Sequence, residues 1–285
     1  MPVCPAAPVC ACARPGCTRP RRYPSDTADG EWVLVAPLLP VPACRTEQGG
    51  RPETNCRRAV VDAIRYVIHN GCVWRALPAD FPPWRTVYGF YQRWHARGVT
   101  IKVHDALRGQ ARQAAGREAE PTAAVIDSQS VRAAPTVPKA SRGWDNAKKV
   151  NGRKRHIAVD TTGLLLEVLV TPASVQDRDG AQPLLFNLKR ARRRVRHTWA
   201  DSGYSGKLGP WSAKWLKLTV EVVKRPHGSH TFEVLPRRWV VERTLAWITS
   251  SRRCARDYER LPAHHEAAVY WAMITLMTRR LTRPG

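Results

Sequence analysis

The spacing of apolar residues changes near residue 120, and the change separates two kinds of structure. Upstream, apolar side chains recur at helical spacing, which predicts one helix over 54–71 and a second from Trp84 to Arg97. The second helix is basic and aromatic. Two short helices joined by a turn are typical of a helix-turn-helix DNA-binding domain, although an ordinary helical domain with core aromatic residues has the same pattern.

Downstream, short apolar runs alternate with turns and helical patterns. The turn Asp160–Gly163 between the second and third runs predicts a hairpin. Helical patterns follow at 181–194 and from Arg237 onward. A hairpin followed by strands that alternate with helices indicates a mixed α/β domain. The predicted strands are 123–126, 155–159, 164–170, 197–200 and 218–223.

These patterns divide the chain into four segments. Residues 1–22 are rich in Pro, Cys and Arg and have no period, which predicts a disordered leader, with a zinc site as the alternative. Residues 23–100 form the predicted helical DNA-binding domain. Residues 101–120 are expected to be a linker helix, and 121–285 form the α/β domain.

Charge gives the first indication of a partner. The chain has 47 Lys and Arg against 23 Asp and Glu, a net charge of +24. Such an excess attracts polyanions, because neutralising phosphates releases counterions. Two clusters, Lys148–Arg155 and Lys189–Arg196, suit phosphate contacts, with solvated surface charge as the alternative. Trp144 and Tyr204 are either packing residues or stacking platforms for an unpaired base.

The apolar residues never form a run of the roughly 18 to 20 that a membrane span requires. The N-terminus also lacks the pattern of a secretory signal. We therefore expect a cytoplasmic protein without a membrane partner.

Three acidic residues stand at positions that need an explanation. Asp127 and Asp201 each end a predicted strand, where ligand sites of α/β sheets gather, although either residue also suits a turn. Glu242 lies beside Trp239 and Leu245 in an amphipathic helix. We expect docking of that helix to carry Glu242 inward, unless the side chain forms a solvated ion pair. Three converging carboxylates can hold two Mg²⁺ ions about 4 Å apart.

Short motifs covering about residues 23 to 260 follow one another along the chain: Trp74–Pro78, Pro82–Trp84, Ala124–Val131, Lys148–His156, Asp160–Leu165, Pro172–Gly180, Ala200–Tyr204 and Leu235–Thr244. In type and order they resemble bacterial insertion-sequence transposases of the DDE class, insertion sequence five type. The resemblance implies an RNase H-like catalytic domain, a mixed sheet flanked by helices, after the small helical domain. It also implies that Asp127, Asp201 and Glu242 are the catalytic and metal-binding residues.

The resemblance implies a DNA transposase that cleaves the ends of an insertion element and joins the freed 3′-hydroxyl to target DNA. The implied cofactor is Mg²⁺ (or Mn²⁺), with two ions per site. The implied partners are double-stranded DNA, at the terminal inverted repeats and the target, and further copies of the chain in a homodimer or higher assembly on the bacterial nucleoid. Two alternatives stay open: a DNA-binding regulator or inactive transposase remnant, and an RNase H-like nuclease without strand transfer.

The signature around the glutamate departs from that of related transposases. Arg238 fits it, but Leu235 stands at the place of a tyrosine and Thr249 at the place of a lysine. Arg252 and Arg253 are candidates to replace that lysine as phosphate contacts.

DNA contacts are expected to divide between two regions. The helix from Trp84 to Arg97 would recognise base edges in a major groove, and the basic loop Lys148–Arg155 would hold phosphates near the cut. The predicted DNA-binding residues are Lys148, Lys149, Arg153, Lys154, Arg155, Arg238, Arg243, Arg85, Gln92 and Arg93.

Overall fold

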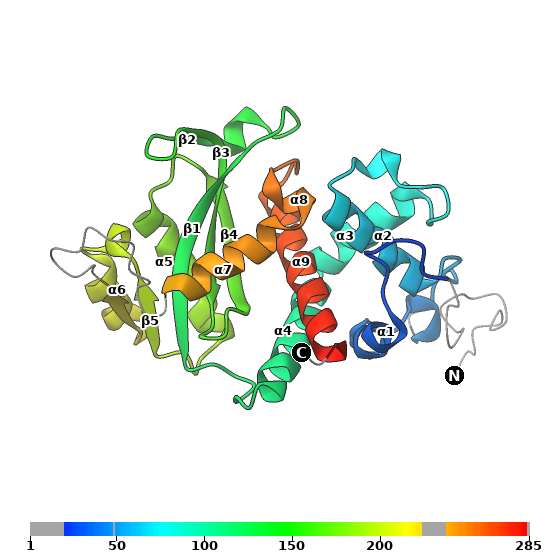
Figure 1. The fold of residues 1–285 in the computed structure, drawn as a ribbon, viewed down its shortest axis with the longest axis horizontal. Helices are drawn as coiled ribbons and strands as arrows, with labels where there is room; N and C mark the ends of the chain where they lie inside the picture. Colours follow the sequence, from blue (N-terminus) through cyan, green and yellow to red (C-terminus); the bar gives the residue numbers. More distant parts are fainter. Residues whose placement is uncertain (1–19, 48, 224–237, 284–285) are drawn as a thin grey trace.

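The computed structural model describes residues 20–47, 49–223 and 238–283 (Figure 1). The predicted leader lies almost wholly outside these residues, and so does Leu235. The backbone of Arg238 is described, but its side chain is not. Candidate contacts of these residues therefore stay predictions.

The helices of the N-terminal part follow from apolar spacing. The α2 residues Val60, Ile64 and Val67 are fully buried, and the helix ends at Gly71, whose φ of 71° is the left-handed conformation typical of a helix end. The two helices expected from the sequence are confirmed as α2 and α3. The described helices before the sheet are α1 (Asp29–Val35), α2 (Arg57–Asn70), α3 (Trp84–Ala96) and α4 (Val99–Ala114), with 3₁₀ turns at Ala36–Leu38, Ala43–Arg45 and Trp74–Ala76.

A mixed sheet forms the centre of the second part. The antiparallel strands β3 and β4 form the predicted hairpin, β1 pairs antiparallel with β3, and β1, β5 and β6 run parallel. The order across the described sheet is β2-β3-β1-β5-β6, and β4 also pairs with β3. The strands are β1 (Ala123–Arg132), β2 (Gly143–Asp145), β3 (Val150–Val159), β4 (Leu165–Pro172), β5 (His197–Ala200) and β6 (Thr219–Val222).

Helices cover both faces of the sheet, as expected for an RNase H-like fold. On one face, leucines of α5 and α6 pack against Ala124 and Ile126 of β1. On the other face, Val240 and Val241 of α7 share a core with Val125. The described helices are α5 (Asp177–Ala191), α6 (Leu208–Leu216), α7 (Arg238–Thr249), α8 (Arg252–Ala255) and α9 (Pro262–Thr282), with 3₁₀ turns at Lys139–Ser141 and Ser202–Tyr204.

Helix α9 joins the two parts of the molecule. It packs against α1, α2, α3 and α4 as well as against β4 and α7, so one hydrophobic core runs across residue 100 (Figure 1). Inside this core, the buried Arg65 of α2 forms an ion pair with Glu31 of α1 and donates to Oγ1 of Thr278 in α9 at 2.6 Å. The N-terminal helices therefore need the C-terminal helix to close their core. That residues 23–100 bind DNA and residues 121–285 carry out catalysis stays a prediction.

Two local expectations need correction. Strand β1 continues to Arg132, so Asp127 lies inside the strand, where it pairs with Ile157 of β3, rather than at its end. Strand β3 begins at Val150, so Gly152 to Arg155 are strand rather than loop. In both cases the pairing of two distant segments extends the strand beyond its local apolar run.

Candidate active site

Asp127 and Asp201 come from adjacent parallel strands. Val125 of β1 is the partner of Trp199 of β5. Asp127 and Asp201 each stand two residues further along, and the backbone of Asp201 is still extended, with φ −81° and ψ −179°. Neighbouring strands lie about 4.8 Å apart, so the two aspartates occupy adjacent positions where β5 ends.

Both aspartates belong to the face of the sheet that α7 covers. Val125 and Trp199 are in the same core as Val241 of α7. Side chains two positions apart on extended backbone point to the same face, which places Asp127 and Asp201 on that side. Figure 1 shows α7 crossing β1.

Glu242 lies on α7, but its side chain is exposed. The expectation that docking carries Glu242 inward is therefore wrong. The helix docks through neighbouring residues: Val241 and Thr244 are buried, and Thr244 Oγ1 donates to the carbonyl oxygen of Gly163 at 2.7 Å. Each residue turns the helix by about 100°, so Glu242 falls beside the buried stripe. The helix is thus anchored within one turn of Glu242.

Three aspartates lie near the buried Tyr204, as their effect on its pKa indicates. Burial, followed by the negative charges of Asp127, Asp177 and Asp201, raises the pKa of Tyr204 well above its ordinary value. A Cβ on Gly203 would lie 3.1 Å from Oδ1 of Asp201 and 4.0 Å from Oδ2 of Asp177. Because Tyr204 is buried, it is a packing residue, and base stacking by its ring is excluded in this conformation.

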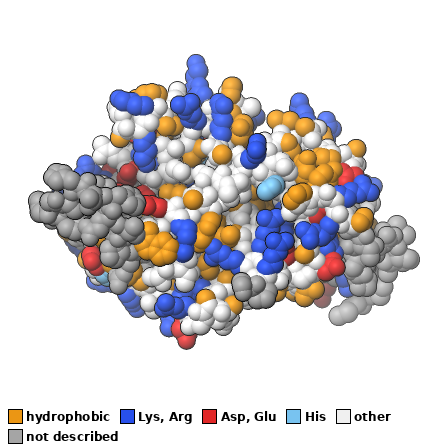
Figure 2. Space-filling model, viewed as in Figure 1, with side chains coloured by type: hydrophobic (Ala, Val, Ile, Leu, Met, Phe, Trp, Pro, Cys, Tyr) orange, Lys and Arg blue, Asp and Glu red, His pale blue; other side chains and the backbone are white. Residues whose placement is uncertain are grey.

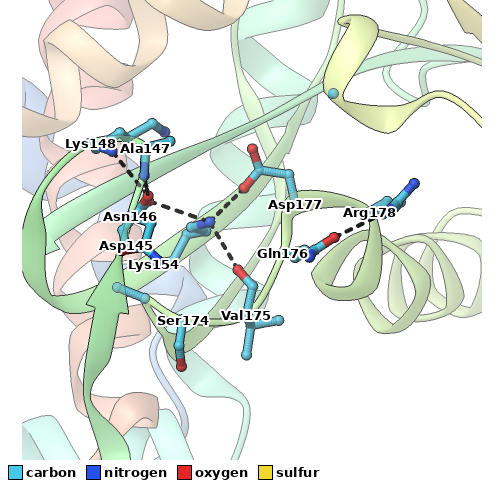
Figure 3. Close-up of a pocket in the computed structure, with 12 residues that line it drawn as sticks. Asp145, Asn146, Ala147, Lys148, Lys154, Ser174, Val175, Gln176, Asp177 and Arg178 are labelled. Atoms are coloured by element: carbon cyan, nitrogen blue, oxygen red, sulfur yellow. Dashed lines mark hydrogen bonds and ion pairs between the residues drawn. The ribbon is translucent and has the colours of Figure 1, made fainter.

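Asp177 was not expected from the sequence as a site residue. It opens α5, and its Oδ1 accepts hydrogen bonds from Ser128 Oγ at 2.7 Å and Lys154 Nζ at 2.8 Å (Figure 3). Burial works against ionisation, but the bonds from Lys154 and Ser128 hold the pKa of Asp177 below its ordinary value. Its place at a helix start was the available signal, but many helices begin with Asp. Asp177 therefore connects the residue after Asp127 with the turn after Asp201.

A second carboxylate shares the same lysine. Lys154 Nζ lies 3.5 Å from Asp145 Oδ2, and Ser130 Oγ donates to that oxygen at 2.5 Å. Burial opposes the charge of Asp145, but hydrogen bonds from Ser130 and the Lys148 backbone lower its pKa to about 2. Asp145, Lys154 and Asp177 line a cavity of about 470 Å³, and Figure 3 shows the Lys154 side chain pointing between the two carboxylates.

Three basic residues expected to contact phosphates are buried instead. Arg153 donates to Asp257 at 3.0 Å, Arg155 donates to the carbonyl oxygen of Cys254 at 2.8 Å, and Lys154 is held as described above. The physical reason is that β3 lies inside a sheet whose two faces are both covered. Lys154 points to the face where Asp177 begins α5, and Arg153 and Arg155 point to the other face, where α8 and Asp257 pack. The prediction of DNA contact is wrong for these three in this conformation.

Other predicted DNA contacts do reach the surface. Lys148 and Lys149 are exposed just before β3, and Trp144 of β2 is 48% exposed. Arg85 and Arg93 are exposed on α3. Their roles stay predictions. On the face of the molecule that Figure 2 draws, Lys and Arg side chains are more widespread than acidic ones.

The remaining predicted contacts are partly engaged within the protein. Gln92 is half-buried, with Nε2 3.5 Å from His264 Nε2, and the half-buried Arg243 donates to the carbonyl oxygen of Thr162 at 2.9 Å. In the second basic cluster, Arg192 is buried and forms an ion pair with Asp105.

The chemistry of the site suits a hard divalent cation. Among the residues that the structure describes, no three His, Cys, Asp or Glu side chains are grouped closely enough to hold a metal ion. The acidic groups around Tyr204 are all carboxylates, and Mg²⁺ and Mn²⁺ take such oxygen ligands. The chemical type of these side chains therefore suits Mg²⁺ or Mn²⁺. Within the described residues, no helix has the length and apolar character of a membrane span.

Comparison with known proteins gives the family. A family model described as "Transposase DDE domain" matches residues 118–277, and a model of putative transposases of the IS4/5 family matches residues 28–104. Two Burkholderia cepacia proteins are similar. An uncharacterized 16.2 kDa protein of insertion element IS402 is 34% identical over 113 residues, which are 37% of this chain and 71% of that protein. The putative transposase of IS402 is 32% identical over 125 residues, which are 41% of this chain and 58% of the relative.

A solved structure, the Mos1 strand transfer complex, is 13% identical over 82% of this chain and 78% of that one, with a TM-score of 0.30. The DDE model alone covers more than half of the chain and includes every strand of the sheet. The chain therefore belongs to the DDE transposase family, whose members cleave DNA and transfer strands.

Proposed function

We propose that this transposase cleaves the ends of an insertion element and joins the freed 3′-hydroxyl to target DNA, with Asp127, Asp201 and Glu242 as its catalytic residues. The observation that carries the proposal is the strand register. Asp127 and Asp201 follow paired residues of β1 and β5 on the face that α7 covers, and α7 carries Glu242, which supports the proposal.

Transposases of this family generally use divalent metal ions. We propose two Mg²⁺ (or Mn²⁺) ions, held by Asp127, Asp201 and Glu242. Such ions activate the attacking hydroxyl and stabilise the leaving oxygen of a phosphodiester. Thr244 anchors α7 to Gly163 two residues after Glu242, and the proposal requires the exposed Glu242 side chain to turn toward the aspartates when metal binds.

Asp177 is proposed as a positioning residue. Its Oδ1 holds Ser128, the residue after Asp127, and its Oδ2 lies beside Gly203, two residues after Asp201. Lys154 forms an ion pair with Asp177, and both side chains lie on the face of the sheet opposite to α7. This fixes the backbone on both sides of the aspartate pair, which is the task of residues that support metal ligands.

The proposed partners are the double-stranded terminal inverted repeats, the target DNA, and further copies of the chain in a homodimer or higher assembly on the nucleoid. Arg85, Gln92 and Arg93 of α3 would recognise the repeats. Lys148 and Lys149 would hold phosphates near the cut.

The deciding experiment uses the full chain, its own element ends and Mg²⁺. The Asp127→Asn variant keeps the side-chain shape and loses the charge, so we expect cleavage to fall to background while binding of the ends persists. Asp179→Asn, an exposed acid in the first turn of α5, is the matched control and should cleave normally. Equal loss of binding and cleavage in Asp127→Asn would show that Asp127 is structural.

The products separate the alternatives. Joined product from the unaltered chain requires a transposase, whereas cleavage without joining identifies a nuclease. Binding of the ends without cleavage identifies a regulator or inactive remnant.

A further inference from the structure

Two arginines enclose one tryptophan on the surface formed by α7 and α9. The guanidinium carbon of Arg243 lies 4.6 Å from the ring centre of Trp247 and 4.4 Å from that of Trp239. The guanidinium carbon of Arg280 lies 4.0 Å from the Trp247 ring centre. Trp239 is 43% exposed, and Arg280 is also exposed. We call these four residues the Trp247 surface.

The two arginines repel one another. Burial, followed by the charge of Arg243, lowers the pKa of Arg280. The nearby carboxylate, Asp160, is fully buried, lies 2.5 Å from Arg112 and accepts the backbone N–H of Leu164 at 2.9 Å. Its charge is therefore largely engaged already. Two like charges held side by side are stabilised when an anion binds to both.

Stacking on indole rings also orients the guanidinium groups. A stacked guanidinium keeps its N–H edge available for a phosphate, which it can bind through two donors. In Arg243 one N–H group is already used, because Nη2 donates to the carbonyl oxygen of Thr162 at 2.9 Å. Further positive charge lies close by, on Arg279 and Arg252 near His69. Burial is the main cause that lowers the pKa of His69, and the charges of these two arginines lower it further. A cavity of about 190 Å³ lies among Trp247, His69 and Arg279. Figure 2 shows Lys and Arg side chains gathered in the region where α9 ends in Figure 1.

The surface begins at the proposed active site. Arg243 follows Glu242 directly, and Trp239 and Trp247 are eight residues apart on α7. At 1.5 Å per residue they span about 12 Å along the helix. Duplex DNA presents one phosphate per strand every 3.4 Å of its axis, so this length meets roughly three phosphates of one strand.

We propose that the Trp247 surface binds the phosphodiester backbone of the duplex DNA that leads away from the cut. The inference rests on the proposed function, because the DNA must pass α7 when a phosphodiester lies near Glu242. Contacts to phosphates fix the register of the DNA and carry no direct sequence information.

The test uses full-length Arg280→Ala and Arg280→Glu variants and a fluorescent duplex, titrated at several salt concentrations. Arg280 is exposed, so both variants should fold, and thermal melting checks this. Arg280→Ala should weaken binding to element ends and random duplex equally, roughly 3- to 10-fold, with the slope of log K against log salt reduced by about 0.9. Arg280→Glu should weaken both further.

The control is Lys214→Ala, which removes an exposed lysine stacked 5.0 Å from the Trp215 ring centre on α6. It should leave affinity and slope unchanged. Unchanged duplex binding in both Arg280 variants would overturn the inference while the proposed function stands. The same would follow from an equal loss in the control, or from a loss confined to single-stranded DNA. Failure of the unaltered chain to bind any DNA would overturn both.

Discussion

Basic residues on β3 and on α7 and α9 have opposite surroundings. Arg153 and Arg155 are almost completely buried and donate to acceptors inside the protein, including Asp257 and the carbonyl oxygen of Cys254. Arg280 is exposed and stacks on Trp247, as does the half-buried Arg243, which also donates to the carbonyl oxygen of Thr162. The density of positive charge along the sequence therefore does not identify a DNA surface. The degree to which each basic side chain is buried among internal acceptors is the better criterion.

The largest expected effect tests the buried side of this comparison. Replacing Arg153 with Ala leaves Asp257 buried without this partner, so we expect the free energy of unfolding to fall by about 3–5 kcal/mol. Urea denaturation measures the loss. Lys149→Ala, an exposed neighbour, should leave stability unchanged. If the Arg153→Ala protein were as stable as the unaltered chain but bound DNA more weakly, Arg153 would be a DNA contact instead of a structural residue.

A smaller effect is expected at the ion pair of the buried Lys154 with the half-buried Asp177, beside the proposed active site. Asp177→Asn keeps an acceptor for Ser128 but removes the charge that Lys154 balances. We expect cleavage to slow about 10- to 100-fold and to need more Mg²⁺, with little change in melting temperature. Asp179→Asn, two residues away, serves as the control. An unchanged rate at every Mg²⁺ concentration would mean that Asp177 supports only the fold.

Glu167 extends the comparison to a half-buried acid whose hydrogen bonds do not offset the cost of removing its charge from water. Burial raises the pKa of Glu167 to about 7, although the Val168 backbone donates to it at 3.3 Å. The unfolded chain ionises Glu167 near its ordinary pKa of 4.5. Stability is therefore lost as pH rises from about 4.5 to about 7. Glu167→Gln should stabilise the protein by about 1–2 kcal/mol at pH 8 and by almost nothing at pH 4.

Denaturation across pH checks this prediction. Glu118→Gln, an exposed acid, should show no such gain. Equal stabilisation by Glu167→Gln at pH 4 and pH 8 would mean that ionisation is not the cause.

The smallest expected effect concerns the exposed start of the basic cluster Lys148–Arg155. Replacing Lys148 and Lys149 with Ala should weaken binding to all DNA sequences a few-fold and reduce the salt slope by about one unit per lost contact. Replacing Gln92 and Arg93 should instead reduce discrimination between element ends and random DNA. Footprints and salt titrations distinguish the two. The opposite pattern would exchange the roles of the two regions.

Much of the fold was predictable because its signals are local. The turn Asp160–Gly163 between apolar runs gave the hairpin, and the stripe from Val60 to Ile68 gave α2. Strand ends were less predictable, since β1 extends past Asp127 through pairing with a segment about 30 residues away. The partner of Arg153 was hidden for the same reason, because Asp257 is 104 residues further along the chain.

The candidate site was predictable in identity and less so in arrangement. Family resemblance pointed to Asp127, Asp201 and Glu242, and their convergence on metal stays a prediction. The exposure of Glu242 depends on how α7 rotates against the sheet, which an amphipathic pattern fixes only coarsely. Asp177 escaped notice because its role depends on Ser128 and Lys154, which come from other strands.

The contact of Arg65 with Glu31 and Thr278 has a consequence for synthesis on the ribosome. Helices α1 and α2 emerge about 200 residues before the end of α9, a delay of roughly 10 to 40 s at ordinary translation rates. Throughout that interval α2 can pack against α3 but not yet against α9, so we expect the nascent N-terminal helices to stay incompletely packed. A chain that is released early would then lack both Arg280 and a closed core. The Trp247 surface would form only after α9 has been translated.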